Sequence, residues 1–330
     1  MTASANTGIV QRLKLALNSR DSTQDDASSA APRVTMEPNH EPLLAELRER
    51  LVHIEDKMDR ALYERDKDKQ IIPAITPEIV NMPNPRLQIF ARQIFSLLRP
   101  QDAVGKRLVR KGRDFDGGYI MLDHALENAT AYSLGINDDA SWDLDMAMLG
   151  CDVFQYDHTI DKFPIAHPKF HSFRVGICEL PTDDPNLKTI DELIRINKHP
   201  DHRDMILKMD IEGAEWKVLE YISETTLARF SQIVLELHLL SHVDDIHRLR
   251  RILNGLEKLN RTHQVIHVHA NNCGRIALVA GVLLPDSLEV TLVRKTDHSF
   301  SECRKIFPTE LDMPCNHAAA DFFLGALGLF

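Results

Sequence analysis

Carboxylate and imidazole side chains stand at the ends of three successive apolar runs in this sequence. Asp210 follows the fourth apolar run of a predicted sheet, Glu236 and His238 close the fifth, and His269 closes the sixth. The carboxyl ends of parallel strands share one edge of a sheet, and ligands bind there. Side chains of these types can remove the proton from a hydroxyl group. We therefore predict Asp210, Glu236, His238 and His269 as candidate catalytic residues, with His238 or His269 as the general base.

Three of these side chains are also ligands that divalent cations accept. Asp210, Glu236 and His238 could bind Mg²⁺ or a similar ion, which would lower the pKa of a bound hydroxyl group. A structural alternative remains open for Asp210 and for His269. Asp210 could cap the following helix, and His269 could be a hydrogen-bonded core residue.

A turn with one glycine follows the first predicted strand and could approach a nucleoside. The turn reads SLGINDD at 133–139, and Gly135 lets the backbone pass close to a ligand. Asp157 lies 22 residues later (157 minus 135), where an acid can accept the hydroxyls of a ribose. The turn lacks the GxGxxG pattern, which disfavours NAD and nucleoside triphosphates. The predicted cofactor-binding residues are Asp116, Ser133, Gly135, Asn137, Asp138, Asp157 and Asp210.

Apolar runs alternate with amphipathic patterns through the middle of the chain. This alternation predicts an α/β fold with a mainly parallel, seven-stranded sheet and an antiparallel hairpin at one edge. The expected strands are 129–134, 152–156, 170–175, 205–209, 233–237, 265–268 and 288–293, and the expected helices include 87–98, 141–149, 189–197 and 243–259. Thr189 and Glu192 form the pattern of a capping box. Residues 107–122, with DGG at 116–118, predict two short strands that form either a lid or a tight hairpin.

The segments outside this α/β region differ in composition. We expect a disordered N-terminal segment at 1–42, because residues 19–42 are rich in Ser, Asp, Ala and Pro and poor in apolar side chains. Heptad spacing at 43–70 predicts a short coiled coil or a single amphipathic helix, which could assemble a homo-oligomer or dock a biosynthetic partner. A linker and helix at 71–104 would precede a domain at 105–296, followed by a C-terminal extension at 297–330.

Composition excludes several classes of protein. A net charge of −10 argues against a nucleic-acid surface, which needs clustered cations. The five cysteines include no CxxC pair, so we expect free thiols in a reducing compartment. The apolar run 318–330 is too short to cross a bilayer and contains Asp321. We therefore expect a cytoplasmic protein without a transmembrane segment, with peripheral membrane association left open.

The segment KMDIEGAEW at 208–216 resembles the signature of the FkbM-type methyltransferases. The resemblance extends to DGGY at 116–119, SLGINDDASWD at 133–143, LELH at 235–238 and HVHANN at 267–272, and so covers roughly residues 105 to 295. It implies a Rossmann-like class I methyltransferase fold, S-adenosylmethionine as the methyl donor and usually an O-methyl product. Such enzymes often carry an acid where this chain has Ser133. Asp116, Asp138 or Asp139 could supply that carboxylate instead.

The resemblance and the residues together lead to a ranked set of functions. We expect an S-adenosylmethionine-dependent O-methyltransferase of a sugar hydroxyl on a glycan or glycoconjugate, where the sugar is implied by the resemblance. An aromatic content of 6% weakly favours a carbohydrate over a planar phenol. The alternatives are a methyltransferase of a small natural product or lipid, and a non-catalytic methyltransferase-like scaffold with a coiled coil.

Overall fold

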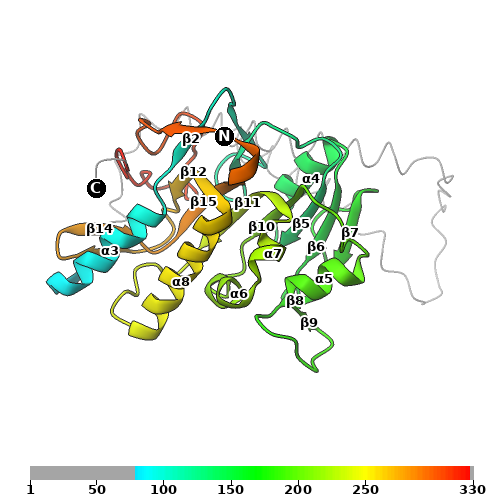
Figure 1. The fold of residues 1–330 in the computed structure, drawn as a ribbon, viewed down its shortest axis with the longest axis horizontal. Coiled ribbons are helices and arrows are strands. Elements are labelled where there is room, and N and C mark those ends of the chain that lie inside the picture. The colour runs from blue at the N-terminus through cyan, green and yellow to red at the C-terminus, as the bar shows by residue number, and fades with distance from the viewer. Residues whose placement is uncertain (1–78, 328–330) are drawn as a thin grey trace, which may run out of the picture. The chain divides into compact units, whose positions relative to one another are not determined.

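The centre of the fold is a seven-stranded sheet with helices on both faces (Figure 1). The computed structural model describes residues 79–327. The strand order is β12-β15-β11-β10-β5-β6-β7, and all adjacent pairs are parallel except the two that involve β15. These strands are β5 (Thr130–Leu134), β6 (Asp152–Tyr156), β7 (Phe170–Phe173), β10 (Met205–Met209), β11 (Phe230–Leu237), β12 (His263–Ala270) and β15 (Leu288–Arg294). The mixed α/β architecture is consistent with the expected Rossmann-like methyltransferase fold.

The two faces of the sheet are built by alternating side chains along each strand. In β10, Leu207 and Met209 belong to the larger core, whereas Ile206 belongs to a second core on the opposite face. The larger core packs against α3 (Pro85–Leu97), α5 (Ile190–Ile196), α6 (Glu215–Tyr221), α7 (Glu224–Leu227) and α8 (Ile246–Thr262). The second core packs against α4 (Ser141–Met148), which contributes Trp142 and Met146. Elements on both faces of the sheet explain why every residue of β10 and β11 is buried.

Most of the predicted elements are confirmed with shifts of a few residues at their ends. The strands at 152–156 and 205–209 have the predicted bounds, and β11 and β12 extend beyond the predicted ranges. The capping box is present, because Glu192 N donates to Thr189 Oγ1 and Thr189 N donates to the Glu192 carboxylate. Within residues 79–327, no helix combines the length and the apolar character that crossing a bilayer requires.

The antiparallel edge is more elaborate than the sequence indicates. β12 and β15 pair antiparallel, as expected, but the chain between them forms a further hairpin of β13 (Ile276–Val279) and β14 (Val282–Pro285). This hairpin joins β1 (Ile79–Met82) in a separate three-stranded sheet. The run from Ile276 to Pro285 is apolar throughout, and its only turn signal is Gly281, so the hairpin was not predicted.

The segment 107–122 is a tight hairpin packed against the main sheet. β3 (Leu108–Lys111) pairs antiparallel with β4 (Tyr119–Leu122), whose residues are all buried. Gln232 of β11 fixes β4, because its side-chain amide donates to Leu122 O and its side-chain oxygen accepts from Leu122 N. The hairpin alternative therefore describes this segment, and its strands are bonded to the sheet rather than free to swing.

Short elements complete the described chain. β2 (Gln101–Ala103) pairs with β16 (Phe300–Glu302), β8 (Gly176–Ile177) pairs with β9 (Leu187–Lys188), and the 3₁₀ turn η1 (Lys295–Asp297) follows β15. The expected C-terminal extension then returns to the sheet. His267 Nε2 of β12 lies 2.7 Å from Asp312 Oδ1, and Phe307 is buried in the larger core. The predictions for 1–42 and 43–70, and those for the first part of the linker at 71–104, lie outside the described residues.

Gly135 lets the turn after β5 cross the end of β10 in close contact. Its φ is +81°, and a Cβ atom at this position would lie 1.6 Å from the carbonyl oxygen of Asp210. The contact is fixed from both sides, because Asp210 N donates to Leu134 O and Lys208 Nζ donates to Gly135 O. No other residue type fits here without moving one of the two chain segments.

We predict that Gly135→Ala destabilises the fold by at least about 1 kcal/mol more than Gly105→Ala does. Gly105 is a matched control, because its φ is +72° and nothing lies within 4 Å of the point that a Cβ atom would occupy there. The control isolates the backbone cost of an L-residue at positive φ, about 1–2 kcal/mol. Urea denaturation of both variants measures the difference, and equal losses of unfolding free energy would contradict the close contact.

Candidate functional site

A cavity of about 630 Å³ opens at the carboxyl ends of β5, β6, β10 and β11. Eight of the residues predicted from sequence line it, namely Asp116, Gly135, Asn137, Asp138, Asp157, Asp210, Glu236 and His238. Two predicted residues do not. Ser133 lies fully buried within β5, and His269 is buried between Glu289 and Asp321. Asp116, Asp138 and Asp139, the candidate replacements for the missing acid at Ser133, all line the cavity.

The cavity wall is strongly acidic. Nine lining residues are carboxylic acids, namely Asp116, Asp138, Asp139, Asp143, Asp157, Asp210, Glu212, Glu236 and Asp286. Lys208 is the one lysine among the lining residues of the described chain, and no arginine is among them. Like charges in a partly buried site repel one another, so a bound cation is favoured and a phosphate is opposed. This charge pattern agrees with the absence of a phosphate-binding glycine loop.

Asp157 at the end of β6 anchors the turn that carries Gly135. Its Oδ2 accepts from Ile136 N and Asn137 N, both at 2.9 Å, and its Oδ1 accepts from Thr159 N and Thr159 Oγ1. Burial alone would raise its pKa, but these hydrogen bonds outweigh it and hold the pKa below the usual range. A carboxylate has about four lone-pair sites, and the chain itself uses all of them here. Asp157 thus fixes the shape of the turn instead of offering a free carboxylate to a ribose.

Lys208 and Tyr119 connect the floor of the cavity to the first turn. Lys208 is only 5% exposed; its ammonium donates to Gly135 O and lies 5.4 Å from the centre of the Tyr119 ring. Its positive charge also counteracts burial at Asp143, whose pKa is nevertheless raised. Tyr119 Oη donates to Asp210 Oδ2 at 3.0 Å, and burial with the nearby Asp210 charge raises the tyrosine pKa well above its usual value.

His238 stands among four carboxylates. Its Nδ1 lies 3.2 Å from Glu215 Oε1, and its Nε2 lies 3.5 Å from both Glu212 Oε2 and Glu236 Oε1 and 4.0 Å from Asp210 Oδ1. Burial would lower the pKa of the imidazole, but the bond to Glu215 and the charges of Glu215 and Asp210 raise it above its usual value. The ring is therefore an imidazolium at neutral pH.

Glu215 is the residue that orients His238. It begins α6, is fully buried, and accepts from Ile211 N and Gly213 N as well as facing the imidazole. Trp216 Nε1 donates to His238 O at 2.6 Å and fixes the backbone at the same point. The start of α6 thus holds the end of β11 in place.

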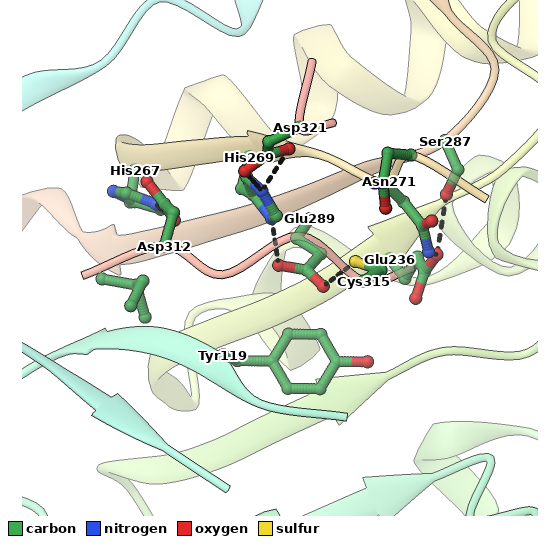
Figure 2. Close-up of polar contacts among 12 residues, drawn as sticks. Tyr119, Glu236, His267, His269, Asn271, Ser287, Glu289, Asp312, Cys315 and Asp321 are labelled. Carbon is green, nitrogen blue, oxygen red and sulfur yellow. Dashed lines mark hydrogen bonds and ion pairs between the residues drawn. The ribbon is translucent and has the colours of Figure 1, made fainter. Parts of the chain in front are cut away.

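Glu236 on β11 lies beside Asn271 and Ser287 and lines the cavity (Figure 2). Its Oε1 accepts from Asn271 Nδ2 at 2.7 Å and from Ser287 Oγ at 2.8 Å. Burial, together with the charges of Asp210 and Glu289, raises its pKa to about 8. At neutral pH this carboxyl group therefore holds a proton.

Two groups of cation ligands meet at the cavity, and they differ from the predicted set. The predicted ligands were Asp210, Glu236 and His238. In the structure, Asp210 and His238 are grouped with Glu212, with their ligand atoms within 4.8 Å of one another. Glu236 is grouped instead with Asp116 and Glu289. The group of three carboxylic acids suits a hard divalent cation such as Mg²⁺, and the group with His238 suits a cation that also accepts a nitrogen ligand.

Sequence reasoning missed Lys208, Tyr119 and Glu215 as site residues. Lys208 carried a usable signal, because a lysine inside an otherwise apolar, buried strand needs a partner for its charge. Glu215 also carried one, since it follows a turn glycine at the start of a helix and could have been expected to accept the free N–H groups there. The position of Tyr119 depends on the packing of a hairpin across the sheet, which no local pattern shows.

Part of the chain that lines this cavity matches a known protein family. Residues 126–263 match the family model described as the methyltransferase FkbM domain. The matched range contains the turn at 133–139 and the segment 208–216, and it leaves the DGGY at 116–119 and the HVHANN at 267–272 outside.

Two curated relatives carry the same type of name. The chain is 31% identical over 129 residues to the probable methyltransferase-like protein 24 of Homo sapiens, and 32% identical over 117 residues to that of Rattus norvegicus. The first alignment covers 36% of this chain and 35% of the human protein, and the second covers 33% and 32%. The match thus spans about a third of the length of these curated relatives. Residues 126–263 of this chain, which contribute much of the cavity wall, are thus similar to the methyltransferase FkbM domain.

Proposed function

We propose that this chain is an S-adenosylmethionine-dependent O-methyltransferase that methylates a sugar hydroxyl of a glycan or glycoconjugate. The observation that carries the proposal is the acidic cavity at the strand ends, inside and beside the FkbM methyltransferase domain. The acceptor is the least constrained part. A methyltransferase of a small natural product or a lipid would bind its cofactor in the same site. A non-catalytic scaffold, the other alternative, would have no use for the proton-accepting groups.

The cavity fits the proposed cofactor in size and charge. Its volume of about 630 Å³ lies within the range of small-molecule sites. S-adenosylmethionine carries a sulfonium cation, which nine carboxylic acids around the cavity favour. The turn held by Asp157 and the glycine at 135 would pass close to the nucleoside, and Asn137 and Asp138 on that turn offer polar groups to it. When bound, the cofactor supplies an electrophilic methyl group.

The chain's own residues would align an acceptor hydroxyl and take its proton. Glu236, His238 and Asp210 lie together on one wall, and Glu215 fixes the imidazole while Asn271 and Ser287 fix Glu236. A hydroxyl placed on this wall could pass its proton to His238 or Glu236 once that group is deprotonated. Since both groups hold protons at neutral pH, this role predicts faster transfer in mildly alkaline solution.

A divalent cation would fit the same wall as an alternative activator. Asp210, Glu212 and His238 would hold it, and its charge would favour the deprotonated form of an acceptor hydroxyl. The polar character of the wall, with Asn271, Ser287 and Asp286 on the cavity, suits a polyol better than a planar ring.

We predict that Asp157→Asn weakens binding of both S-adenosylmethionine and S-adenosylhomocysteine by at least about tenfold. The amide keeps one oxygen acceptor, so the turn at Ile136 and Asn137 loses part of its anchor. Asp183→Asn is the matched control, because Asp183 is exposed and does not line the cavity. Isothermal titration at low and high salt measures the affinity of both variants. Salt should weaken binding of the sulfonium compound more than binding of its neutral product. No binding of either compound to the wild-type chain would contradict the cofactor assignment.

We predict that His238→Gln and Glu236→Gln each lower methyl transfer about 10²- to 10⁴-fold and leave S-adenosylhomocysteine affinity nearly unchanged. The assay follows tritiated methyl from S-adenosylmethionine into a panel of neutral oligosaccharides, glycolipids and phenols. His247→Gln, an exposed histidine on α8, is the matched control. Transfer to phenols alone would refute the sugar acceptor. Cofactor binding without transfer to any acceptor would favour the scaffold.

We predict that the unfolding free energy falls as pH rises from 6.5 to 9. Glu236 and His238 have folded pKa values of about 8 and 9, above their ordinary values of 4.5 and 6.5. The folded chain therefore binds more protons than the unfolded chain in this window, and stability is lost at up to about 1.4 kcal/mol per pH unit for each extra proton. The histidines with lowered pKa values, such as His263 at about 4, change the stability mainly below this pH window. Urea denaturation at several pH values measures the slope. A Glu236→Gln, His238→Gln double variant should reduce it, and His269, whose pKa the carboxylates of Glu289 and Asp321 raise to about 10, should account for part of the slope that remains.

A further inference from the structure

We infer that His269, Glu289 and Cys315 form a buried binding site for a zinc ion beside the cavity wall. His269 lies on β12, Glu289 on β15 and Cys315 on the C-terminal segment, and their exposed fractions are 1%, 5% and 5%. Figure 2 shows the three side chains converging. One nitrogen, one oxygen and one sulfur from these residues lie within 4.8 Å of one another. The site involves residues that the proposed methyl transfer does not use, so it stands or falls independently of that proposal.

The two carboxylate oxygens of Glu289 each contact one of the other ligands, at distances near those between zinc ligands. His269 Nδ1 lies 3.0 Å from Glu289 Oε2, and Cys315 Sγ lies 3.3 Å from Glu289 Oε1. With ordinary zinc–ligand bond lengths, the corresponding edges of a tetrahedron are about 3.4 Å for N···O and about 3.6 Å for S···O. Small side-chain shifts would therefore admit the ion.

A further carboxylate supports the histidine in the manner typical of zinc sites. Both oxygens of Asp321 lie 3.0–3.1 Å from His269 Nε2, on the side of the ring opposite Glu289. A zinc-binding histidine usually donates its second N–H to a carboxylate or carbonyl group, which orients the ring. Asp321 is placed to do this, and it comes from the same C-terminal segment as Cys315.

The mixed ligand set selects the metal. A thiolate and an imidazole favour Zn²⁺ over Mg²⁺ or Ca²⁺, which take oxygen ligands. A water molecule or the nearby Asp116, which shares a ligand group with Glu289, could take the fourth position. Such an ion would tie the C-terminal segment to β12 and β15.

Charge is conserved when the ion enters. Carboxylates only accept hydrogen bonds, so His269, which faces one on each side, carries protons on both nitrogens. Zinc displaces the proton on His269 Nδ1 and the thiol proton that Cys315 donates to Glu289. Two protons leave as one dication enters, and the net charge of the buried cluster stays the same.

Cobalt substitution of the full chain tests the site without an activity assay. After chelation and addition of Co²⁺, we expect a thiolate-to-cobalt charge-transfer band in the wild-type chain and its loss in Cys315→Ser. Cys303→Ser is the matched control on the same segment, since Cys303 is buried outside the ligand group. Cys273→Ser controls for the cysteine that lines the cavity. Zinc should also raise the thermal stability of the wild-type chain and of both control variants.

Several outcomes would overturn the site. They are a wild-type chain without the band, a band that persists in Cys315→Ser, and a band lost in Cys273→Ser. If Cys315→Ser does not fold, Asp321→Asn provides the second variant. It should keep the band and weaken zinc binding roughly 10- to 100-fold, because the ring loses its orienting partner. Unchanged zinc affinity in that variant would also contradict the proposed arrangement.

Discussion

Negative charge crowded at one edge of the sheet is the constraint on which the rest of this site depends. Nine carboxylic acids line a single cavity, and a buried carboxylate without a partner costs several kcal/mol. The chain meets this cost in different ways at different positions. Backbone and hydroxyl donors surround Asp157, Lys208 faces Asp143, and an imidazolium at 238 faces four acids. Glu236 instead keeps its proton to about pH 8. What remains is an excess of negative potential that a cationic ligand would relieve.

The fold provides this crowding through two close contacts between chain segments. Gly135 brings the turn after β5 against the end of β10, and Glu215 brings the start of α6 against the end of β11. In the first contact, the carbonyl group of Gly135 orients the ammonium group of Lys208. In the second, the carboxylate of Glu215 orients the imidazole of His238. The second contact also shows why His238 is held better than a residue on a free loop, because its ring and its backbone carbonyl are both bonded to α6.

Sequence patterns predicted the sheet and eight of the residues that line the cavity, because strand positions and strand ends depend on local periodicity. Apolar runs placed the strands, and polar residues at their ends placed Asp210, Glu236 and His238 together. The patterns failed where partners come from distant segments. Alternation puts His267 and His269 on one face of β12, but their partners Asp312 and Asp321 lie more than 40 residues later, in a segment without periodicity. Asp157 was found by its spacing, yet only the structure shows that its own turn uses its lone pairs.

The arrangement of protons argues for a working site more than for a scaffold. A domain that only binds a partner has no need to keep Glu236 buried and protonated beside an imidazolium, since an apolar residue of similar size would be more stable there. Asn271 and Ser287 fix Glu236, and Glu215 fixes His238, so the two groups with shifted pKa values are also the two that are held in place. Fixed geometry combined with shifted pKa values is what the proposed proton transfer from a bound hydroxyl requires. The proposed function would thus account for the cost in stability at this wall.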